Sequence, residues 1–232
     1  MQKILGVDKI LVYDLGCSEN IKSVFRHYVI EGLLEVQPYS LPGHIPSNPN
    51  RGFIGPQIQP QFSHDKHLTV LDCHQRLGGY DYILAADFDE LTIPKEEFTL
   101  KQLLKNLRKE NPRAAGFYFY VQFHLEEWGR YRNDTDIFFQ QYVTSGKPKW
   151  ECEKYIYIPS RVYTARIHSF NNMGQYTSVY VKPEIATIHH YRKCPQGWSD
   201  CNPEVMVDNQ ITKYEAMHTK NTHIVLQKLN LK

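Results

Sequence analysis

The first half of the sequence alternates short apolar runs with segments in which apolar residues recur at helical spacing. Residues 9–13 (KILVY) and 33–36 (LLEV) are apolar runs that predict two buried strands. Between them, Ser18 suits a helix N-cap, and apolar residues then recur at helical spacing until Gly32 ends the helix. The pattern therefore predicts a strand, a helix and a second strand.

The alternation continues as far as residue 111. A helix is predicted over residues 61–77, and residues 82–86 (YILAA) form a third apolar run of strand length. Four leucines at helical spacing between residues 100 and 107 predict a further helix that ends before Pro112. Residues 38–60 contain six prolines and predict a long irregular loop.

The second half of the chain changes to a pattern of strands. Extended segments are predicted at residues 117–123, 155–158, 161–167 and 185–191, and a helix is expected within residues 204–232. Strands that alternate with helices indicate a parallel sheet, and a length of 232 residues suits one core. We therefore expect a single α/β domain over residues 1–232, with added strands in its C-terminal half.

Charge and composition exclude some functions. The chain has 27 basic and 25 acidic residues, a balance that gives no support to a nucleic-acid-binding protein. The 16 Tyr, 11 Phe and 3 Trp suit a site that holds sugar rings, although core packing accounts for most aromatic residues. There is neither an apolar run long enough to cross a membrane nor a signal peptide.

The five cysteines include no CxxC pair, so a zinc ribbon is not expected. Cys194 and Cys201 could close a small disulfide loop in a secreted chain, whereas in a cytosolic chain they would be unrelated thiols. Asn133 begins a glycosylation acceptor pattern, Asn-Asp-Thr. Together these features favour the secretory pathway.

The strongest chemical signal is Asp87-Phe88-Asp89, which directly follows the third apolar run. In an extended segment both carboxylates would point one way and Phe88 would point into the core. Two carboxylates this close repel each other unless a cation lies between them, and Mn²⁺ or Mg²⁺ would also bind substrate phosphates. The alternative is a polar turn in which an Asp caps the next element.

The surrounding residues resemble the glycosyltransferase A fold, a Rossmann-like and mostly parallel sheet flanked by helices. There, a strand that ends in Asp contacts uracil, as Asp14 could, and "DYILAADFDE" has the shape of the strand and DxD signature. Simple helix capping is the alternative role for Asp14. Arg76 could approach the diphosphate as a fixed cation, or it could be a solvated helix residue.

Within this fold, the chain most resembles glycosyltransferase family 92. The segments "LGVDKILVYD", "LLEVQPYSLP", "DCHQRL…YDYILAADFDELTIP" and "PEIATIHHYRKC" carry it from about Leu5 to Cys194. Membership implies an inverting, Mn²⁺-assisted transfer, typically of galactose from UDP-galactose to a glycan residue such as fucose. It also implies a Golgi enzyme with one N-terminal membrane anchor.

Further site residues follow from this resemblance. A late histidine commonly supplies a third metal ligand in this fold, and His190 is the candidate, with His168 in reserve. On a strand His189 and His190 face opposite ways, so only one of them can enter the site. Arg192, followed by Lys193, would place positive charge near the leaving diphosphate.

An inverting transfer also needs a base for the acceptor hydroxyl. The candidates are Glu126 and Glu127, beside Trp128, which could hold a sugar face; Asp136, Glu151 and Glu153 remain open. Without an HExxH motif, His64, His67 and His74 are interpreted as structural rather than as a zinc site.

The chain departs from the family pattern at its start, where the first strand and helix of the fold and the membrane anchor are expected before Leu5. A glycan-binding relative without catalysis is therefore one alternative. A metal-dependent phosphohydrolase that uses the same Asp pair is another, although the further His and Asp clusters of a two-metal site are missing from the sequence.

Overall fold

The computed structural model describes residues 1–39, 58–195, 197–198, 201 and 204–231, with residues 58–65, 152 and 153 described by their backbone alone. The elements as far as residue 110 are β1 (Ile10–Asp14), α1 (Glu19–Ile30), β2 (Leu34–Pro38), α2 (Ile58–Arg76), β3 (Ile83–Leu84), β4 (Glu90–Pro94) and α3 (Leu100–Glu110). The later elements are β5 (Ala114–Leu125), η1 (Glu126–Trp128), α4 (Phe138–Gln141), β6 (Thr144–Gly146), β7 (Lys149–Tyr157), η2 (Pro159–Arg161), β8 (Val162–Ala165), β9 (Phe170–Asn172), β10 (Thr177–Val181), β11 (Ala186–Arg192), β12 (Val205–Val207), η4 (Gln210–Tyr214) and α5 (Glu215–Lys228). Among the described helices, none has both the length and the apolar character needed to cross a bilayer.

The largest sheet is mixed, with the strand order β3-β7-β5-β11-β4 and with β10 paired to the first half of β5. β10 and β11 run parallel to β5, whereas the β3–β7, β7–β5 and β11–β4 pairs are antiparallel. The prediction of a mostly parallel sheet is therefore wrong for this largest sheet. Nearly all of β11 is buried, so it lacks the regular alternation of apolar and polar residues that is typical of an antiparallel strand with one face in solvent.

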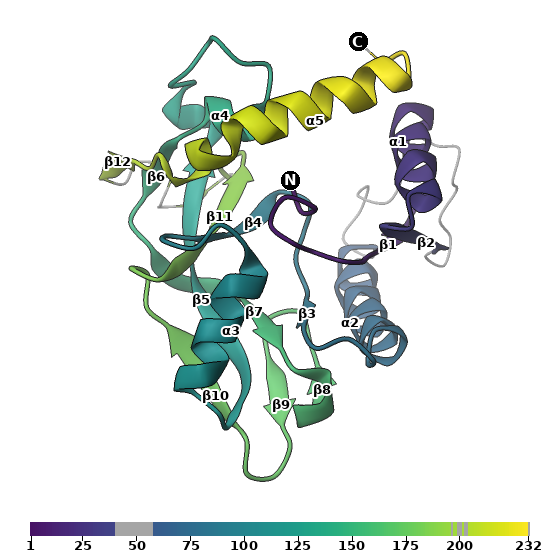
Figure 1. Ribbon diagram of the computed structural model, residues 1–232, viewed down its shortest axis with the longest axis vertical. Coiled ribbons are helices and arrows are strands. Elements are labelled where there is room, and N and C mark those ends of the chain that lie inside the picture. The colour runs from purple at the N-terminus through teal and green to yellow at the C-terminus, as the bar shows by residue number, and fades with distance from the viewer. Residues whose placement is uncertain (40–57, 196, 199–200, 202–203, 232) are drawn as a thin grey trace.

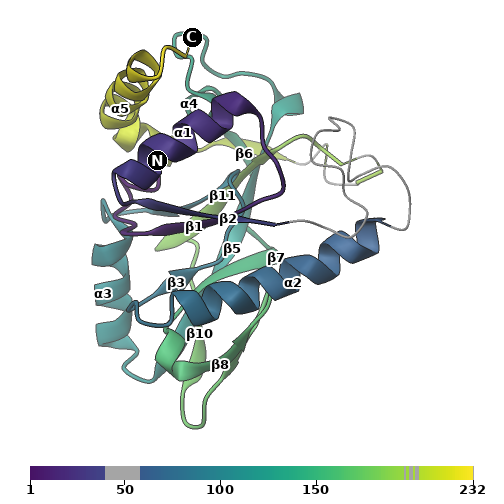
Figure 2. The same cartoon turned by 90° about the vertical axis from the view of Figure 1, so that its right-hand side faces the viewer.

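β1 and β2 form a separate parallel pair, in which Ile10 lies opposite Leu34. Figures 1 and 2 show this pair between α1 and α2. The predictions for this region are confirmed: Ser18 is the N-cap of α1, and Gly32, directly after the helix, has a φ of +75° that an L side chain rarely adopts.

The two faces of the large sheet pack against different helices. On one face, the predicted leucine stripe of α3 is buried against alternate residues of β5, including Phe117 and Phe119. A capping box between Thr99 and Gln102 begins α3. The other face packs against α2, which covers Tyr155 and its neighbours. α3 and α2 thus lie on opposite faces of the sheet (Figures 1 and 2).

Element boundaries differ from the predictions where tertiary pairing decides them. The apolar run 82–86 forms only the two-residue strand β3, and β4, which begins directly after Asp89, was not predicted. The predicted strands of the second half are present, and α5 confirms the C-terminal helix. Most of the predicted loop 38–60 lies outside the described residues.

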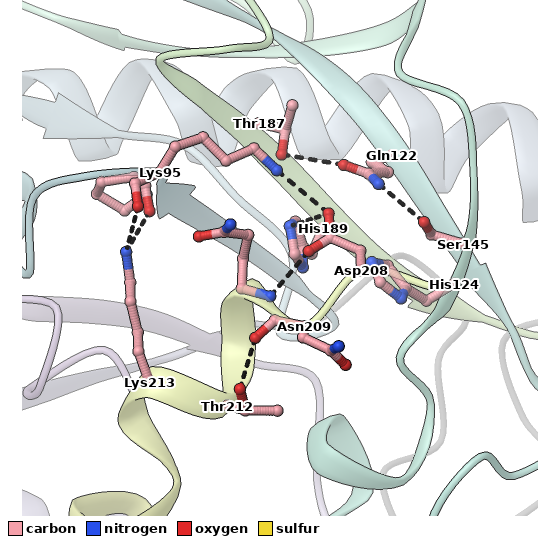
Figure 3. Close-up of polar contacts among 12 residues, drawn as sticks. Lys95, Gln122, His124, Ser145, Thr187, His189, Asp208, Asn209, Thr212 and Lys213 are labelled. Carbon is pink, nitrogen blue, oxygen red and sulfur yellow. Dashed lines mark hydrogen bonds and ion pairs between the residues drawn. The ribbon is translucent and has the colours of Figure 1, made fainter. Parts of the chain in front are cut away.

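Behind β11 lies a buried polar cluster (Figure 3). His189 Nε2 lies 3.7 Å from Asp208 Oδ2, and Lys95 Nζ donates to the same carboxylate oxygen at 3.2 Å. The N–H of Gln210 donates to Asp208 Oδ1 at 2.9 Å. Lys213 Nζ donates to the backbone carbonyls of Pro94, the last residue of β4, and of Lys95 and Glu97 just after it. These contacts tie η4 to β4 and β11.

His124 of β5 stacks on His189, with ring centroids 4.6 Å apart, and its Nδ1 donates to the carbonyl of Tyr142 at 2.9 Å. Burial lowers the pKa of His124 to about 4; burial, and then the neighbouring His124, lower the pKa of His189 well below its usual value. The two stacked rings do not converge on one point, because the lone pair of each ring nitrogen lies in the ring plane. The pair therefore does not suit a shared metal ion.

The buried histidines His124 and His189 should make the fold sensitive to acid. Below their ordinary pKa of about 6.5 the two histidines take up protons in the unfolded chain but stay neutral in the folded one. The free energy of unfolding should therefore fall between about pH 7 and pH 5, with each histidine adding a slope of up to about 1.4 kcal/mol per pH unit. Urea unfolding at several pH values measures this slope. His124→Gln should flatten it and the exposed-site control His223→Gln should not; equal slopes in wild type and His124→Gln would contradict the assignment.

Candidate active site

A cluster of charged side chains lies at the end of β3. The Asp87 carboxylate is bound by Lys66 Nζ at 2.8 Å and by Lys154 Nζ at 3.2 Å. Lys154, from β7, also lies 3.2 Å from Glu90 Oε2, and the same Glu90 oxygen accepts the N–H of Asp87 at 2.8 Å. Helix α2 and strands β4 and β7 thus converge on Asp87.

Two members of this cluster are almost completely buried. Lys154 is 3% exposed and Glu90 is 1% exposed. Burial lowers the pKa of Lys154, but the carboxylates of Glu90 and Asp87 outweigh it and raise the pKa above its usual value. Burial also raises the pKa of Asp87, and Lys154 followed by Lys66 outweighs it, so that the net shift is downward. Lys154 and Asp87 therefore form an ion pair in which each partner favours the charged form of the other.

Asp89 and His190 form a second pair beside this cluster. His190 Nε2 lies 3.4 Å from Asp89 Oδ2, and His190 Nδ1 lies 3.6 Å from Glu90 Oε1. The N–H of Tyr191 donates to the carbonyl of Asp89 at 2.9 Å, which fixes β11 against the turn. Burial raises the pKa of Asp89, but the hydrogen bond with His190 outweighs it and lowers the pKa. As predicted, only one of the two adjacent histidines enters the site.

The turn that contains the two aspartates differs from the expected extended segment. Residues 88 and 89 form a turn, and Phe88 is 71% exposed, so the prediction that its ring enters the core is wrong. The Phe88 ring instead stacks near Phe25 of α1, with centroids 6.2 Å apart. The turn arises because β4 begins at Glu90 and reverses the chain immediately after Asp89.

A cavity of about 1160 Å³ opens beside Asp87. Most strand residues of β1 and both residues of β3 lie on its walls. Asp87, Lys66 and Lys154 are among the charged residues of the lining, and Lys101, Lys105 and Arg108 of α3 add further positive charge. The cavity thus extends along β1, β3 and α3, and Asp87 lies on its wall three residues after the end of β3. Its size suits a small-molecule ligand.

Two predicted donor-binding residues stand apart from this cluster. Asp14 Oδ1 accepts the N–H groups of Gly16 and Cys17 at 2.7 and 2.8 Å, so the side chain stabilises the turn after β1. Arg76 donates to Asp72 at 2.6 Å, and it lies ten residues after Lys66, about 15 Å further along α2. Their roles toward uracil and diphosphate stay predictions.

The predicted base candidates lie just beyond β5, next to the end of β11. Glu126 and Glu127 form η1, and Glu127 Oε2 accepts the N–H of Cys194 at 2.9 Å. The Trp128 indole N–H donates to the carbonyl of Cys201 at 2.8 Å, and Cys194 and Cys201 form a disulfide. Arg192 Nε donates to the Lys193 carbonyl at 3.3 Å. η1 and the disulfide loop therefore support one another.

The donor atoms of the acidic and histidine side chains determine where a metal ion could bind. Among the described residues, no group of three or more His, Cys, Asp or Glu side chains stands ready to hold an ion. Asp89 and His190 fit a shared divalent cation, since their nearest atoms are 3.4 Å apart and offer one oxygen and one nitrogen. Asp87 fits less well, because two ammonium groups already neutralise it. The reserve candidate His168 lies in the turn between β8 and β9.

Sequence reasoning missed the lysines that complete this site. Lys66 and Lys154 are 21 and 67 residues from Asp87 in the sequence. The one available signal was Lys154 itself, a charged residue directly before the apolar run 155–158. A lysine in a buried strand requires a carboxylate partner, because an unpaired buried charge is costly.

Comparison with known proteins identifies the family. No curated protein matches the chain. The sequence model of glycosyltransferase family 92 matches residues 1–228, nearly the whole chain. The chain, with its paired acids at the end of β3, belongs to glycosyltransferase family 92.

Proposed function

We propose that this chain catalyses metal-dependent, inverting transfer of a hexose from a UDP-sugar to a glycan. UDP-galactose is the proposed donor, and a fucose residue of a glycan is the proposed acceptor. The observation that supports this most strongly is the position of Asp87 on the wall of a cavity of about 1160 Å³ that extends along β1, β3 and α3. Family membership supplies the reaction class, since glycosyltransferases join a sugar donor to an acceptor.

In this proposal Asp89 and His190, with Asp87, hold Mn²⁺ or Mg²⁺. The ion would supply charge neutralisation for the departing diphosphate. Lys66 and Lys154 add two fixed ammonium groups on the cavity side of Asp87. Preorganised cations at the point where negative charge develops stabilise a transition state without rearrangement of solvent. The uridine would lie near Asp14, whose second carboxylate oxygen is the proposed acceptor for the uracil, and Arg76 and Arg192 would add longer-range positive potential.

The transfer itself needs one proton movement. The acceptor oxygen bonds to the anomeric carbon as the bond from that carbon to the diphosphate oxygen breaks, and the acceptor proton passes to a carboxylate. Glu126 is the preferred candidate of the two, because one carboxylate oxygen of Glu127 already accepts the N–H of Cys194. The nucleoside diphosphate leaves with the bonding electrons.

The proposed compartment is the Golgi lumen, with the full-length protein anchored by one N-terminal membrane helix. The Cys194–Cys201 disulfide supports an oxidising compartment. The acceptor asparagine of the glycosylation pattern, Asn133, is exposed in a loop, as that modification requires.

The first prediction concerns Asp89. Asp89→Asn should reduce sugar transfer at least about 100-fold, because the amide removes the negative charge that faces the proposed cation. UDP release from a panel of UDP-sugars with Mn²⁺ measures transfer, and the melting temperature should stay near that of wild type. The matched control is Asp134→Asn, an exposed carboxylate outside the site, which should keep full activity. Undiminished transfer by Asp89→Asn would exclude the assigned role.

The second prediction separates the two lysines. Lys66 is partly exposed, so Lys66→Gln should raise the KM for the UDP-sugar about tenfold and leave stability nearly unchanged. Lys154 is buried between two carboxylates, so Lys154→Gln should destabilise the fold by about 3 kcal/mol or more. Steady-state kinetics and urea unfolding measure the two effects. Equal loss of stability in both variants would show that the lysines are not divided in this way.

A further inference from the structure

An aromatic platform lies on the face of the large sheet opposite α3. It consists of Trp150 from β7, Tyr118 and Tyr120 from β5, and Tyr180 from β10. Trp150 is 41% exposed and Tyr180 is 61% exposed. The Trp150 ring lies 4.9 Å from the Tyr180 ring and 5.0 Å from the Tyr120 ring, centroid to centroid. Two of the largest exposed side chains in the described part of the protein are therefore in contact.

The platform is held rigidly from below. Tyr118 and Tyr180 are directly opposite each other on the parallel strands β5 and β10, and their rings stack at 5.4 Å. Tyr118 is only 7% exposed, and its ring also stacks on Phe170 at 4.9 Å. The exposed rings thus rest on a buried aromatic column and are preorganised, so little conformational entropy is lost when they bind a ligand.

A break in strand pairing brings Trp150 to this position. Phe119 pairs with Lys154, but Val121, two residues further along β5, pairs with Lys149, five residues earlier along β7. The residues between therefore bulge from the ladder, and a β-bulge of this kind re-aims side chains and often lies next to an active site. Core packing alone does not require this irregularity, because a regular strand would fill the core equally well.

The same strand links the platform to the candidate active site. Lys154, which binds Asp87, is four residues from Trp150, so their Cα atoms are at most about 14 Å apart. β3 pairs only with Ile156 and Tyr157, so this part of β7 has no strand beside it on that edge among the described residues. A chain of a few sugars is long enough to span the distance between the platform and Asp87.

We propose that the platform of Trp150, Tyr118, Tyr120 and Tyr180 binds a neutral sugar ring of the acceptor glycan, outside the candidate active site. One face of a hexopyranose presents C–H groups of slight positive polarity, which suit the negative face of an aromatic ring. Ser178 lies two residues before Tyr180 on the same side of β10 and hydrogen-bonds Asn172, so a hydroxyl and an amide adjoin the rings for sugar hydroxyls. This inference deepens the proposed function, because it assigns a subsite to the acceptor.

The test is glycan binding in the absence of donor and metal. An array of immobilised neutral oligosaccharides is the probe, and wild type should bind a subset of them. Trp150→Ala and Tyr180→Ala should weaken that binding about tenfold, while Trp150→Phe, which keeps a ring, should largely preserve it. The matched control is Tyr163→Ala, which removes a ring that is 66% exposed on β8 but outside the platform, and which should bind as wild type does.

The outcomes separate this inference from the proposed reaction. Asp89→Asn should bind the array as wild type does although it transfers no sugar. Binding that depends on Trp150 in a protein without any transferase activity would contradict the proposed function and support the platform. Each of three results would overturn the platform as a sugar-binding site. Trp150→Ala could bind as wild type does, or wild type could fail to bind oligosaccharide at millimolar concentration. The third is equal capture of a glycoprotein before and after removal of its glycans.

Discussion

The arrangement of the site depends on one buried charge. Lys154 is 3% exposed and stays charged because Glu90 and Asp87 flank its ammonium group. An unpaired ammonium at this position would cost several kcal/mol, so its neutralisation constrains where both carboxylates lie. Asp87 is thereby drawn onto β7, and Glu90 begins β4 beneath it. The turn between them leaves Asp89 at the surface opposite His190. The different contacts of Asp87, Asp89 and Glu90 thus follow from the need to pair one lysine.

β11 holds the opposite side of this arrangement. Its His190 faces Asp89, and its His189 faces the buried cluster of Asp208, Lys95 and His124. The hydrogen bond from Tyr191 N–H to the Asp89 carbonyl and the antiparallel pairing with β4 fix the strand against the turn. This tightly packed polar layer behind the strand fixes its position, and precise placement is what a preorganised catalytic site requires. The acid sensitivity expected from His124 and His189 is the cost of this packing.

The sequence allowed prediction of those features that depend on local pattern. Each of the following could be predicted, because it depends on neighbouring residues: the leucine stripe of α3, the Ser18 cap of α1, the helix α2 and the strands of the second half. Strand direction could not be predicted, since β4 was not foreseen and the buried strand β11 lacks an alternating pattern that would mark it as antiparallel. The outward-facing Phe88 could not be foreseen without β4. The DxD pair and His190 were predicted from motif and resemblance, and the structure places His190 beside Asp89. Lys66 and Lys154 were missed, because only the tertiary fold brings residues so distant in sequence to one carboxylate.

The central claim is that the acids at the end of β3, together with His190, hold the cation that binds the donor's diphosphate. The most direct measurement is anomalous scattering from Mn²⁺ in crystals grown with UDP. We expect a manganese peak about 2.1 Å from an Asp89 carboxylate oxygen and from His190 Nε2, with the diphosphate between the ion and Lys66. Well-ordered UDP in the cavity with no manganese at Asp89, or manganese bound only elsewhere, would contradict it.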